Sequence, residues 1–247
     1  MARFASLEDE ALARPWAWRS QEATVRDALY RSLEDEHAAL ARARGAWEPT
    51  EAERILALAQ RAFGDLRGLL VRLDDAVLDR ALAEREWSLR QVLRHLLGAE
   101  KRYAAHVVYA AHRAEGEPVR MPDERLPRDD DAEVSGDVAR ILDRFAALRA
   151  QSDSLCGGLP QGALTRPTIW SGHEVDVRFR LHRFASHITE HTIQCEKTLE
   201  LLGARQSEAR RIVRRIWAAR GELEAIDDEA TLRALDAAHS ERAASLP

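Results

Sequence analysis

The chain has 247 residues, of which 45% are hydrophobic and 32% are charged, and its formal net charge is −5 at pH 7. This length allows a sizeable buried core in one large domain, or in a core domain with extensions. The acidic balance argues against nucleic acid as the main partner, because a nucleic-acid-binding surface is normally basic. Ala, Leu, Arg and Glu dominate while Gly (12) and Pro (8) are few, so the composition favours an all-α fold.

Features of secretion and membrane insertion are missing from the sequence. There is no run of about 18 apolar residues, which a membrane-spanning helix needs. The opening "MARFASLEDEALARPWAW" lacks the apolar core of a secretory signal. The two cysteines, Cys156 and Cys195, are too few for a disulfide framework. We therefore expect a cytoplasmic protein with reduced thiols and no membrane partner.

Two helical regions are expected in the first third of the chain. The first covers about residues 6–44, is interrupted at Pro15, and ends at "GAWEP". The second starts at a T-x-x-E capping box formed by Thr50 and Glu53. Apolar residues then recur at helical spacing from Ile55 to Val77, which predicts a helix of about seven turns.

A third helix is predicted to start at Ser88. Ser88 and Gln91 form an S-x-x-Q capping box, and Trp87 and Val92 are spaced for a hydrophobic staple. After this helix the stretch "EGEPVRMPDERLPRDDD" contains three prolines and a charge run. It is predicted to be irregular and long enough to cross from one end of a helix bundle to the other.

The remaining segments complete the predicted fold. Helices are expected at about 135–155 and 174–202, separated by the loop "QGALTRPTIWSGHEV", and two more at about 207–225 and 228–244. No internal repeat stands out. We predict an all-α, antiparallel four-helix bundle over residues 51–203. Helical extensions occupy residues 1–50 and 204–247, the latter packing on the bundle or on a partner.

The stretch "FRLHRFASHITEHTIQC" places two histidines on an apolar helix face. At about 100° per residue, His187 and His191 are separated by about 40° and one turn, whereas His182 faces elsewhere. An H-x-x-x-H pair can give one metal ion two ligands from a single rigid helix. A pair of this kind is more often two hydrogen-bonded core histidines, so the pattern alone leaves both interpretations open.

A metal site would need a third ligand from another helix. His95 is the best candidate by position, two turns into its helix, whereas His106 lies about 16 Å further along the same helix. Three neutral imidazoles with an open fourth position would suit Zn²⁺, Ni²⁺ or Fe²⁺. Cys195 is a weaker candidate, better interpreted as a small core residue. Periodicity alone cannot bring His95 opposite His187.

Four more residues could border such a site or have a purely structural role. Glu100 and Tyr103 follow His95 by one to two turns, so they could line the mouth of a pocket or simply pack. Trp170 and His173 precede the histidine helix, so they could overhang the site or close the end of the bundle.

Two segments together resemble the DinB-like (YfiT-like) superfamily of metal-binding four-helix bundles: "WSLRQVLRHLLGAE" and "LHRFASHITEHTIQCEKTLELLG". The shared features are a W-S helix start, a histidine seven residues after the Ser, and an H-x-x-x-H followed by a leucine-rich end and Gly. The resemblance covers about residues 51–203 and implies that His95, His187 and His191 are the three ligands of a divalent metal. The family name does not imply DNA binding.

The resemblance also implies a class of chemistry. Characterised members are transferases and isomerases in which the metal activates a low-molecular-weight thiol, since a divalent cation lowers the pKa of a bound thiol. We therefore expect a metal-dependent enzyme acting on a small-molecule substrate. The alternative is a non-catalytic helical scaffold or stress-associated interaction protein with a vestigial or structural metal site. Ile212, Ile216 and Trp217 form an apolar strip that could cover the bundle or the second copy in a homodimer.

Overall fold

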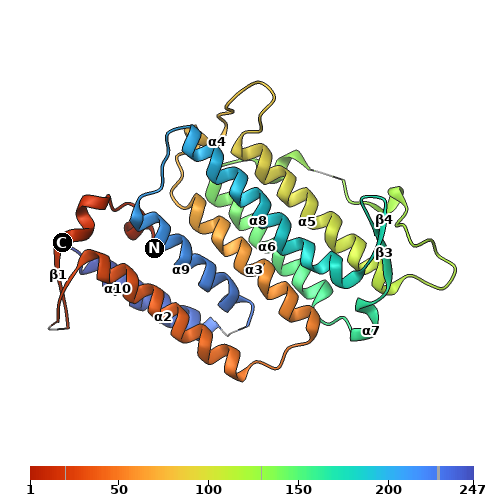
Figure 1. Ribbon diagram of the computed structural model, residues 1–247, viewed down its shortest axis with the longest axis horizontal. Helices are drawn as coiled ribbons and strands as arrows, with labels where there is room; N and C mark the ends of the chain where they lie inside the picture. The colour runs from red at the N-terminus through yellow and green to blue at the C-terminus, as the bar shows by residue number, and fades with distance from the viewer. Residues whose placement is uncertain (20, 129, 227–228) are drawn as a thin grey trace. The chain divides into compact units, whose positions relative to one another are not determined.

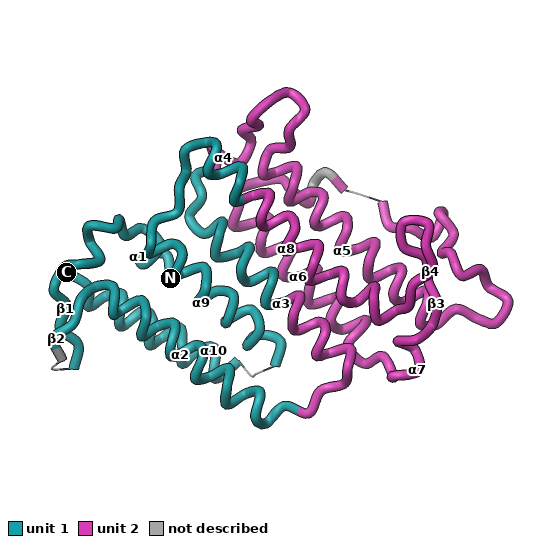
Figure 2. Tube along the Cα trace, viewed as in Figure 1, with its two compact units in different colours: residues 1–47, 60–74, 196–247 teal, residues 48–59, 75–195 magenta. Residues whose placement is uncertain are grey.

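The structure is a computed structural model that describes residues 1–19, 21–128, 130–226 and 229–247 (Figure 1). It divides into two compact units, shown in Figure 2. Unit 1 comprises residues 1–47, 60–74 and 196–247, and unit 2 comprises residues 48–59 and 75–195. Among the described residues, no helix is both long and apolar enough to cross a membrane. The division into domains after residues 50 and 203 stays a prediction.

Unit 2 is built around four long helices within its described residues. Its helices are α3 (Glu51–Leu70), α4 (Asp75–Leu78), α5 (Leu89–His112), α6 (Val138–Cys156), α7 (Gln161–Leu164) and α8 (Val177–Leu201), of which α3 and α8 continue into unit 1. One buried cluster joins the four long helices through Ile55, Val107, Cys156 and Phe184. The predicted all-α architecture is confirmed.

Local signals place two helix starts correctly, those of α3 and α5. The Thr50 N–H donates to Glu53 at 2.7 Å and the Ser88 N–H donates to Gln91 at 2.8 Å, so both predicted capping boxes are present. The predicted end of the first of these helices was wrong. α3 stops at Leu70 because Arg72 has a φ of 54°, in the left-handed region that ends helices, and Val77 belongs to the separate α4.

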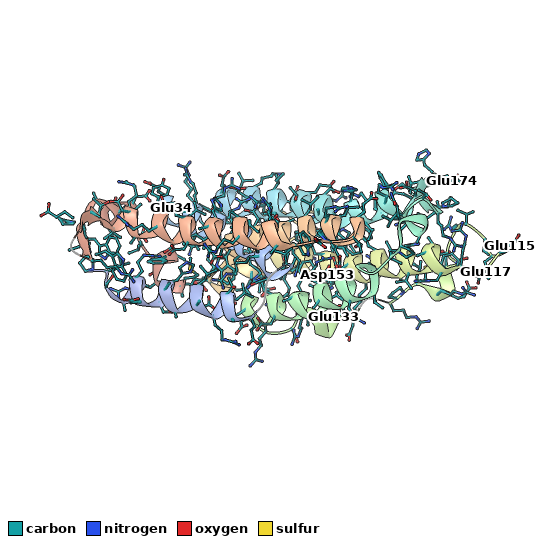
Figure 3. All side chains as sticks on the ribbon, turned by 90° about the horizontal axis from the view of Figure 1, so that it is seen from below. Glu34, Glu115, Glu117, Glu133, Asp153 and Glu174 are labelled. Carbon is teal, nitrogen blue, oxygen red and sulfur yellow. The ribbon has the colours of Figure 1, made fainter. Side chains whose placement is uncertain are left out.

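The connection between α5 and α6 crosses the length of the bundle, as predicted. It contains the 3₁₀ turns η2 (Asp123–Arg125) and η3 (Asp131–Val134). Arg90, near the start of α5, donates to the carbonyl of Gly136, just before α6, at 2.8 Å. The two helices therefore start at the same end and run parallel. Figure 3 labels Glu117 and Glu133, two carboxylates of this connection that pair with Arg125 and Lys101.

The stretch predicted as the loop before α8 is largely regular. It contains α7 and a hairpin of β3 (Pro167–Trp170) and β4 (His173–Asp176), with Trp170 opposite His173. Ser171 and Gly172 have φ values of 48° and 84°, as a type I′ turn requires. α8 consequently starts at Val177 rather than at about residue 174, and its Phe179 N–H donates to Asp176 at 2.8 Å.

Unit 1 contains the N- and C-terminal segments. Its further elements are α1 (Ala2–Ala5), η1 (Asp9–Ala13), β1 (Pro15–Trp18), β2 (Gln21–Thr24), α2 (Val25–Ala46), α9 (Glu208–Glu224) and α10 (Glu229–Ala244). The helical region predicted over about residues 6–44 is confirmed by α2 from Val25 onward, but its first part was wrong, because η1 and the β1–β2 hairpin precede this helix. Asp228, the predicted start of the last helix, lies outside the described residues.

The apolar strip of α9 packs within unit 1. Ile212 and Ile216 are buried in a cluster with Phe4, Leu12 and Leu29 from the N-terminal segment. The guanidinium of Arg67 lies 4.2 Å from the ring centroid of the half-buried Trp217. The N-terminal residues therefore cover much of the strip that the sequence left without a partner.

The two hairpins belong to an internal repeat, so the expectation of no repeat was wrong. Residues 11–31 and 163–183 align without a gap at a constant spacing of 152 residues. The identical positions in the first copy are Ala11, Leu12, Arg14, Pro15, Trp18, Glu22, Val25, Arg26, Leu29 and Arg31. In each copy, the first residue of the long helix donates its N–H to the carbonyl of the arginine that precedes the hairpin. The N–H of Val25 donates to Arg14 at 3.0 Å, and the N–H of Val177 donates to Arg166 at 3.1 Å.

A second segment is repeated as well. The stretch "TEAERI" lies at the start of α3 and the stretch "SEARRI" at the start of α9. The first residue of each stretch, Thr50 or Ser207, occupies the capping position before its helix. Glu51 accepts two hydrogen bonds from Arg178 in unit 2, and Glu208 accepts two from Arg26 in unit 1. Each unit therefore pairs a capped helix start with the arginine that follows its hairpin.

Close helix packing in unit 1 requires glycine at position 64. A Cβ atom at Gly64 would lie 2.2 Å from the backbone oxygen of Trp217, which cannot move independently of α9. We expect Gly64→Ala to lower the free energy of unfolding by about 1–3 kcal/mol, the usual cost of overpacking. Gly45→Ala is the control, since nothing lies within 4 Å of an added Cβ there. That exposed helical site should gain up to about 1 kcal/mol. Equal effects in urea denaturation would contradict this interpretation.

His239 should make the stability of unit 1 depend on pH. It is 1% exposed on α10, and neither ring nitrogen has a hydrogen-bond partner among the described residues. Burial, and then the charges of Arg220 and Arg242, lower the pKa of His239 to about 4. Between that value and the unfolded value of about 6.5 the unfolded chain binds more protons, so stability falls as pH falls.

The His239→Leu variant tests this pH dependence. Wild type should lose about 2 kcal/mol more than His239→Leu between pH 7 and pH 5, which follows from proton linkage at one such group. The exposed His37 on α2 supplies the control variant His37→Ala, which should follow the wild-type curve. Parallel curves for wild type and His239→Leu in urea denaturation would show that this histidine does not titrate with folding.

Candidate metal centre

Two antiparallel helices of unit 2 carry the three predicted ligands. The Ser88 cap sets the start of α5, so His95 lies on its second turn. His187 and His191 lie on successive turns of α8. Ring contacts pair His95 with His191 and, further along α5, Tyr103 with Phe184, which precedes both histidines in α8. This opposite direction brings an early residue of α5 to the middle of α8.

The three imidazoles converge through the same ring atom. The Nε2 of His187 lies 3.1 Å from the Nε2 of His95 and 3.1 Å from the Nε2 of His191. Two nitrogens bound to one Zn²⁺ at a tetrahedral angle are about 3.3 Å apart. Among the described residues, this is the one group of three or more His, Cys, Asp or Glu side chains with ligand atoms close enough for a shared ion, all within 4.8 Å. The donor set therefore fits a divalent metal.

Gln194 orients the ring of His191. The Nδ1 of His191 lies 2.7 Å from the Oε1 of Gln194. Because an amide oxygen only accepts hydrogen bonds, this contact places the proton on Nδ1 and leaves a lone pair on Nε2. A hydrogen bond to the second ring nitrogen is the usual way in which proteins orient a metal-binding histidine. The sequence analysis missed Gln194, although it follows His191 by three residues on the same helix face.

The neutral form of His187 is strongly favoured. Burial, followed by the charges of His191 and His95, lowers the pKa of His187 to about 3. A neutral imidazole is the form that binds metals. Each neutral ring carries one proton, so a ring nitrogen either donates or accepts a hydrogen bond. The three Nε2 atoms that face one another therefore cannot all find a hydrogen-bond partner within the group, whereas a cation would bind all three lone pairs.

Aromatic rings border the three histidines on two sides. The ring centroid of Trp87 lies 5.1 Å from that of His95 and 6.4 Å from that of His191, while its side chain stays 42% exposed. The ring of Tyr103 lies 5.2 Å from that of His187. Trp87 was predicted as a staple residue for Val92, and its ring contacts make it a wall of the site as well. His95 and His191 are only half-buried, so solvent reaches the group.

A cation and an anion lie next to this aromatic wall. Arg183 donates to Glu190 at 2.8 Å, and its guanidinium lies 4.9 Å from the ring centroid of Trp170. Trp170 in turn packs edge-on against Tyr103 with a centroid distance of 5.4 Å. The β3–β4 hairpin therefore contacts the surroundings of the site through Trp170. Figure 3 labels Glu174 of β4, at the same end of the bundle as Glu115 and Glu117.

The other residues considered in the sequence do not belong to the group of converging ligand atoms. His182 is exposed on α8 and His173 is exposed on β4. Cys195 is fully buried, and burial raises the pKa of its thiol to about 12, which suits a core residue. Glu100 is buried and pairs with Arg149 at 2.6 Å.

The histidine pair follows the second copy of the repeat, at residues 163–183, but not the first copy, at residues 11–31. Extending the alignment along α2 places Asp35 at the position of His187 and Ala39 at that of His191. Asp35 accepts a hydrogen bond from Arg242 at 2.7 Å. The same backbone design therefore carries an ion pair in unit 1 and imidazoles in unit 2, so the histidines are not required to build the hairpin and helix.

Comparisons with known proteins agree with the fold. A family model described as the DinB superfamily matches residues 58–195. No curated protein matches the chain. Among solved structures, the chain is similar to one described as "YfiT from Bacillus subtilis is a probable metal-dependent hydrolase with an unusual four-helix bundle topology". The match has 15% identity and a TM-score of 0.50, and covers 64% of this chain and 94% of that chain. The predicted four-helix-bundle fold is thus confirmed.

Proposed function

The chain belongs to the DinB superfamily, and from that premise we propose that it is a mononuclear metal-dependent enzyme. His95, His187 and His191 hold one divalent ion, and the reaction transfers or isomerises a substrate with the help of a small thiol or a similar nucleophile. The observation that carries the proposal is the convergence of three Nε2 atoms, with 3.1 Å between successive pairs, at a group that solvent reaches.

A divalent ion bound there would lower the pKa of a coordinated thiol or water and hold the deprotonated form as a nucleophile. The chain's own residues prepare the site for this chemistry. Gln194 keeps the Nε2 lone pair of His191 directed inward, and burial keeps His187 neutral. The rings of Trp87 and Tyr103 exclude water from two sides and offer apolar surface to a substrate.

Arg183 supplies positive charge beside the site. Its guanidinium pairs with the exposed Glu190, and the pKa of Glu190 is held below its usual range mainly by this hydrogen bond. A substrate carboxylate could replace Glu190 as the partner of Arg183, because arginine binds carboxylates through two parallel hydrogen bonds. We therefore propose a small anionic substrate.

Hydrolysis is the second candidate reaction. The similar solved structure from Bacillus subtilis is described as a probable metal-dependent hydrolase, and water in place of a thiol would use the same donor set. The two reactions differ in whether turnover requires an added thiol.

Metal analysis followed by turnover assays tests the proposal. Protein expressed with Zn²⁺, Ni²⁺ or Fe²⁺ should contain about one metal per chain, and the double variant His187→Ala/His191→Ala should contain none. Turnover of small anionic esters and of thiol-acceptor pairs should then require the metal. Dependence on an added thiol favours transfer, and turnover without it favours hydrolysis. A metal-free wild type that is equally stable would contradict the proposal.

A non-catalytic scaffold is the alternative from another class. Purified protein that binds metal but turns over neither the esters nor the thiol-acceptor pairs would favour this non-catalytic alternative. Light scattering on the full chain would test the expected homodimer. Truncation after Gly203 is unsuitable for that purpose, because removing α9 would expose the core residues of unit 1 that pack on Ile212 and Ile216.

A further inference from the structure

Unit 2 contains a cavity that the histidine site does not use. It has a volume of about 510 Å³ and is bordered by α5, α6 and the connection between them. This size falls within the range of roughly 300–1,000 Å³ that is usual for small-molecule sites. Most of its lining is apolar and includes Val108, Met121, Pro127, Leu148 and Leu155. Leu155 is 48% exposed, which marks the cavity's rim.

The cavity lies further along α5 than His95. Its lining residues on this helix run from Lys101 to Tyr109, which places them about 9–21 Å beyond His95 along the helix axis at 1.5 Å per residue. None of the three histidines lines the cavity. A ligand in the cavity would therefore not contact the three histidines, so the inference is independent of the proposed function.

The connection between α5 and α6 is fastened over the cavity by polar contacts. The Tyr109 hydroxyl donates to the carbonyl of Pro118 at 2.7 Å, and Arg144 donates to the carbonyl of Glu133 at 3.1 Å. Lys101 also pairs with Glu133. These contacts preform the cavity, so a ligand would not have to order the connection on binding.

One buried polar group is left for a ligand. Ser152 lines the cavity and is 1% exposed, yet its Oγ has no hydrogen bond of good geometry among the described residues. The hydroxyl lies beside the carboxylate of Glu100, which accepts but does not donate. With its proton directed towards that carboxylate, Ser152 offers its lone pairs to a hydrogen-bond donor.

The charges at the cavity are already balanced. Lys101 pairs with Glu133, and Arg125 pairs with Glu117 at 3.0 Å. An anionic ligand would have to break one of these pairs and would be repelled by Glu100 near Ser152. An uncharged ligand can bind without breaking an ion pair and is not repelled by Glu100.

We propose that this cavity binds an uncharged, mainly hydrocarbon molecule that carries one hydroxyl group, of the class of medium-chain aliphatic alcohols. The chain occupies the apolar lining, and the hydroxyl donates a hydrogen bond to Ser152. The ligand class follows from the lining, the size, the balanced charges and the buried hydroxyl of Ser152.

Titration of the full-length protein with 1-octanol tests the proposal, with octanoate as the charged probe of equal chain length. We expect saturable binding of 1-octanol, measured by calorimetry and ligand-detected NMR, and at least about tenfold weaker binding of octanoate. Ser152→Ala should weaken octanol binding by about 2–12-fold, the range for one hydrogen bond. Ala105→Phe should abolish binding by filling the cavity, whereas Ala147→Phe, on the exposed face of α6, should not.

Several results would overturn the proposal. No saturable octanol binding, or equal binding by wild type and Ala105→Phe, would show that the cavity is not the site. Octanoate binding as tightly as octanol would contradict the argument from balanced charges. If Ala105→Phe does not fold, as judged by circular dichroism, the Ser152→Ala comparison decides, because an unchanged octanol affinity there contradicts the assigned hydroxyl contact.

Discussion

His95→Ala is expected to remove most of the thermal stabilisation that a divalent metal gives the wild-type chain. Metal that binds only the folded state adds about 3–4 kcal/mol when its free concentration is a hundred to a thousand times the dissociation constant. For a chain of this size, that corresponds to a rise in Tm of roughly 6–16 °C. His187 and His191 would remain as two ligands on one helix, which bind far less tightly than three. The measurement is Tm with metal and with chelator.

His182→Ala is the matched control for this experiment. His182 lies on the same helix as two of the ligands, but it is exposed and is not part of the group of converging nitrogens. The metal-dependent shift in Tm should therefore persist in this variant. It should also shrink between pH 7.5 and pH 5 in the wild type, because protons compete with metal for imidazole nitrogens. A shift that survives His95→Ala but is lost in His182→Ala would place the metal on the other face of α8.

Arg149→Met is expected to be the most damaging substitution in the core of unit 2. Arg149 is completely buried on α6, donates to Glu100 at 2.6 Å and to Asp153 at 2.5 Å, and lies 5.3 Å from the ring centroid of Phe184. Asp153 is labelled in Figure 3. Removing one member of a buried ion pair leaves an uncompensated charge and typically costs about 3–5 kcal/mol. Urea denaturation at pH 7.5 measures this loss.

The pH dependence of this variant tests the electrostatic explanation. Burial raises the pKa of Asp153 to about 6, even with Arg149 beside it, and burial also raises the pKa of Glu100. Without Arg149 both carboxyls can take up protons as pH falls, which removes the uncompensated charge. The destabilisation by Arg149→Met should therefore be smaller at pH 5 than at pH 7.5.

Two further variants control for the change in size and for the pairing. Arg140→Met, at an exposed site of the same helix, should change the stability by no more than about 0.5 kcal/mol. The double variant Arg149→Met/Glu100→Leu should recover part of the stability lost in Arg149→Met, because it removes the fully buried carboxylate of Glu100 and leaves only the partly exposed Asp153 beside the new apolar side chain. A double variant less stable than Arg149→Met would show that packing, and not the unpaired charge, dominates.

Local sequence patterns determined two helix starts and one half of the candidate site. The Thr50 and Ser88 capping boxes act over three residues, so the sequence alone locates them, and both are present. The four-residue spacing of His187 and His191 likewise places both rings on one helix face, whatever the rest of the chain does. The hairpins were missed for a different reason. Their strands are four residues long, too short for periodicity to reveal, although the repeat of residues 11–31 at 163–183 was available.

Only the tertiary structure decided which residues far apart in the sequence meet. His95 lies 92 residues before His187, and their contact depends on the antiparallel packing of α5 against α8. The pairing of Glu100 with Arg149 and the exposure of Ser152 to a cavity depend in the same way on α6, whose direction is set by the connection that crosses the bundle. Helical periodicity states which face a residue occupies. Which helix that face meets is set by side-chain packing across the whole core, and no local pattern encodes it.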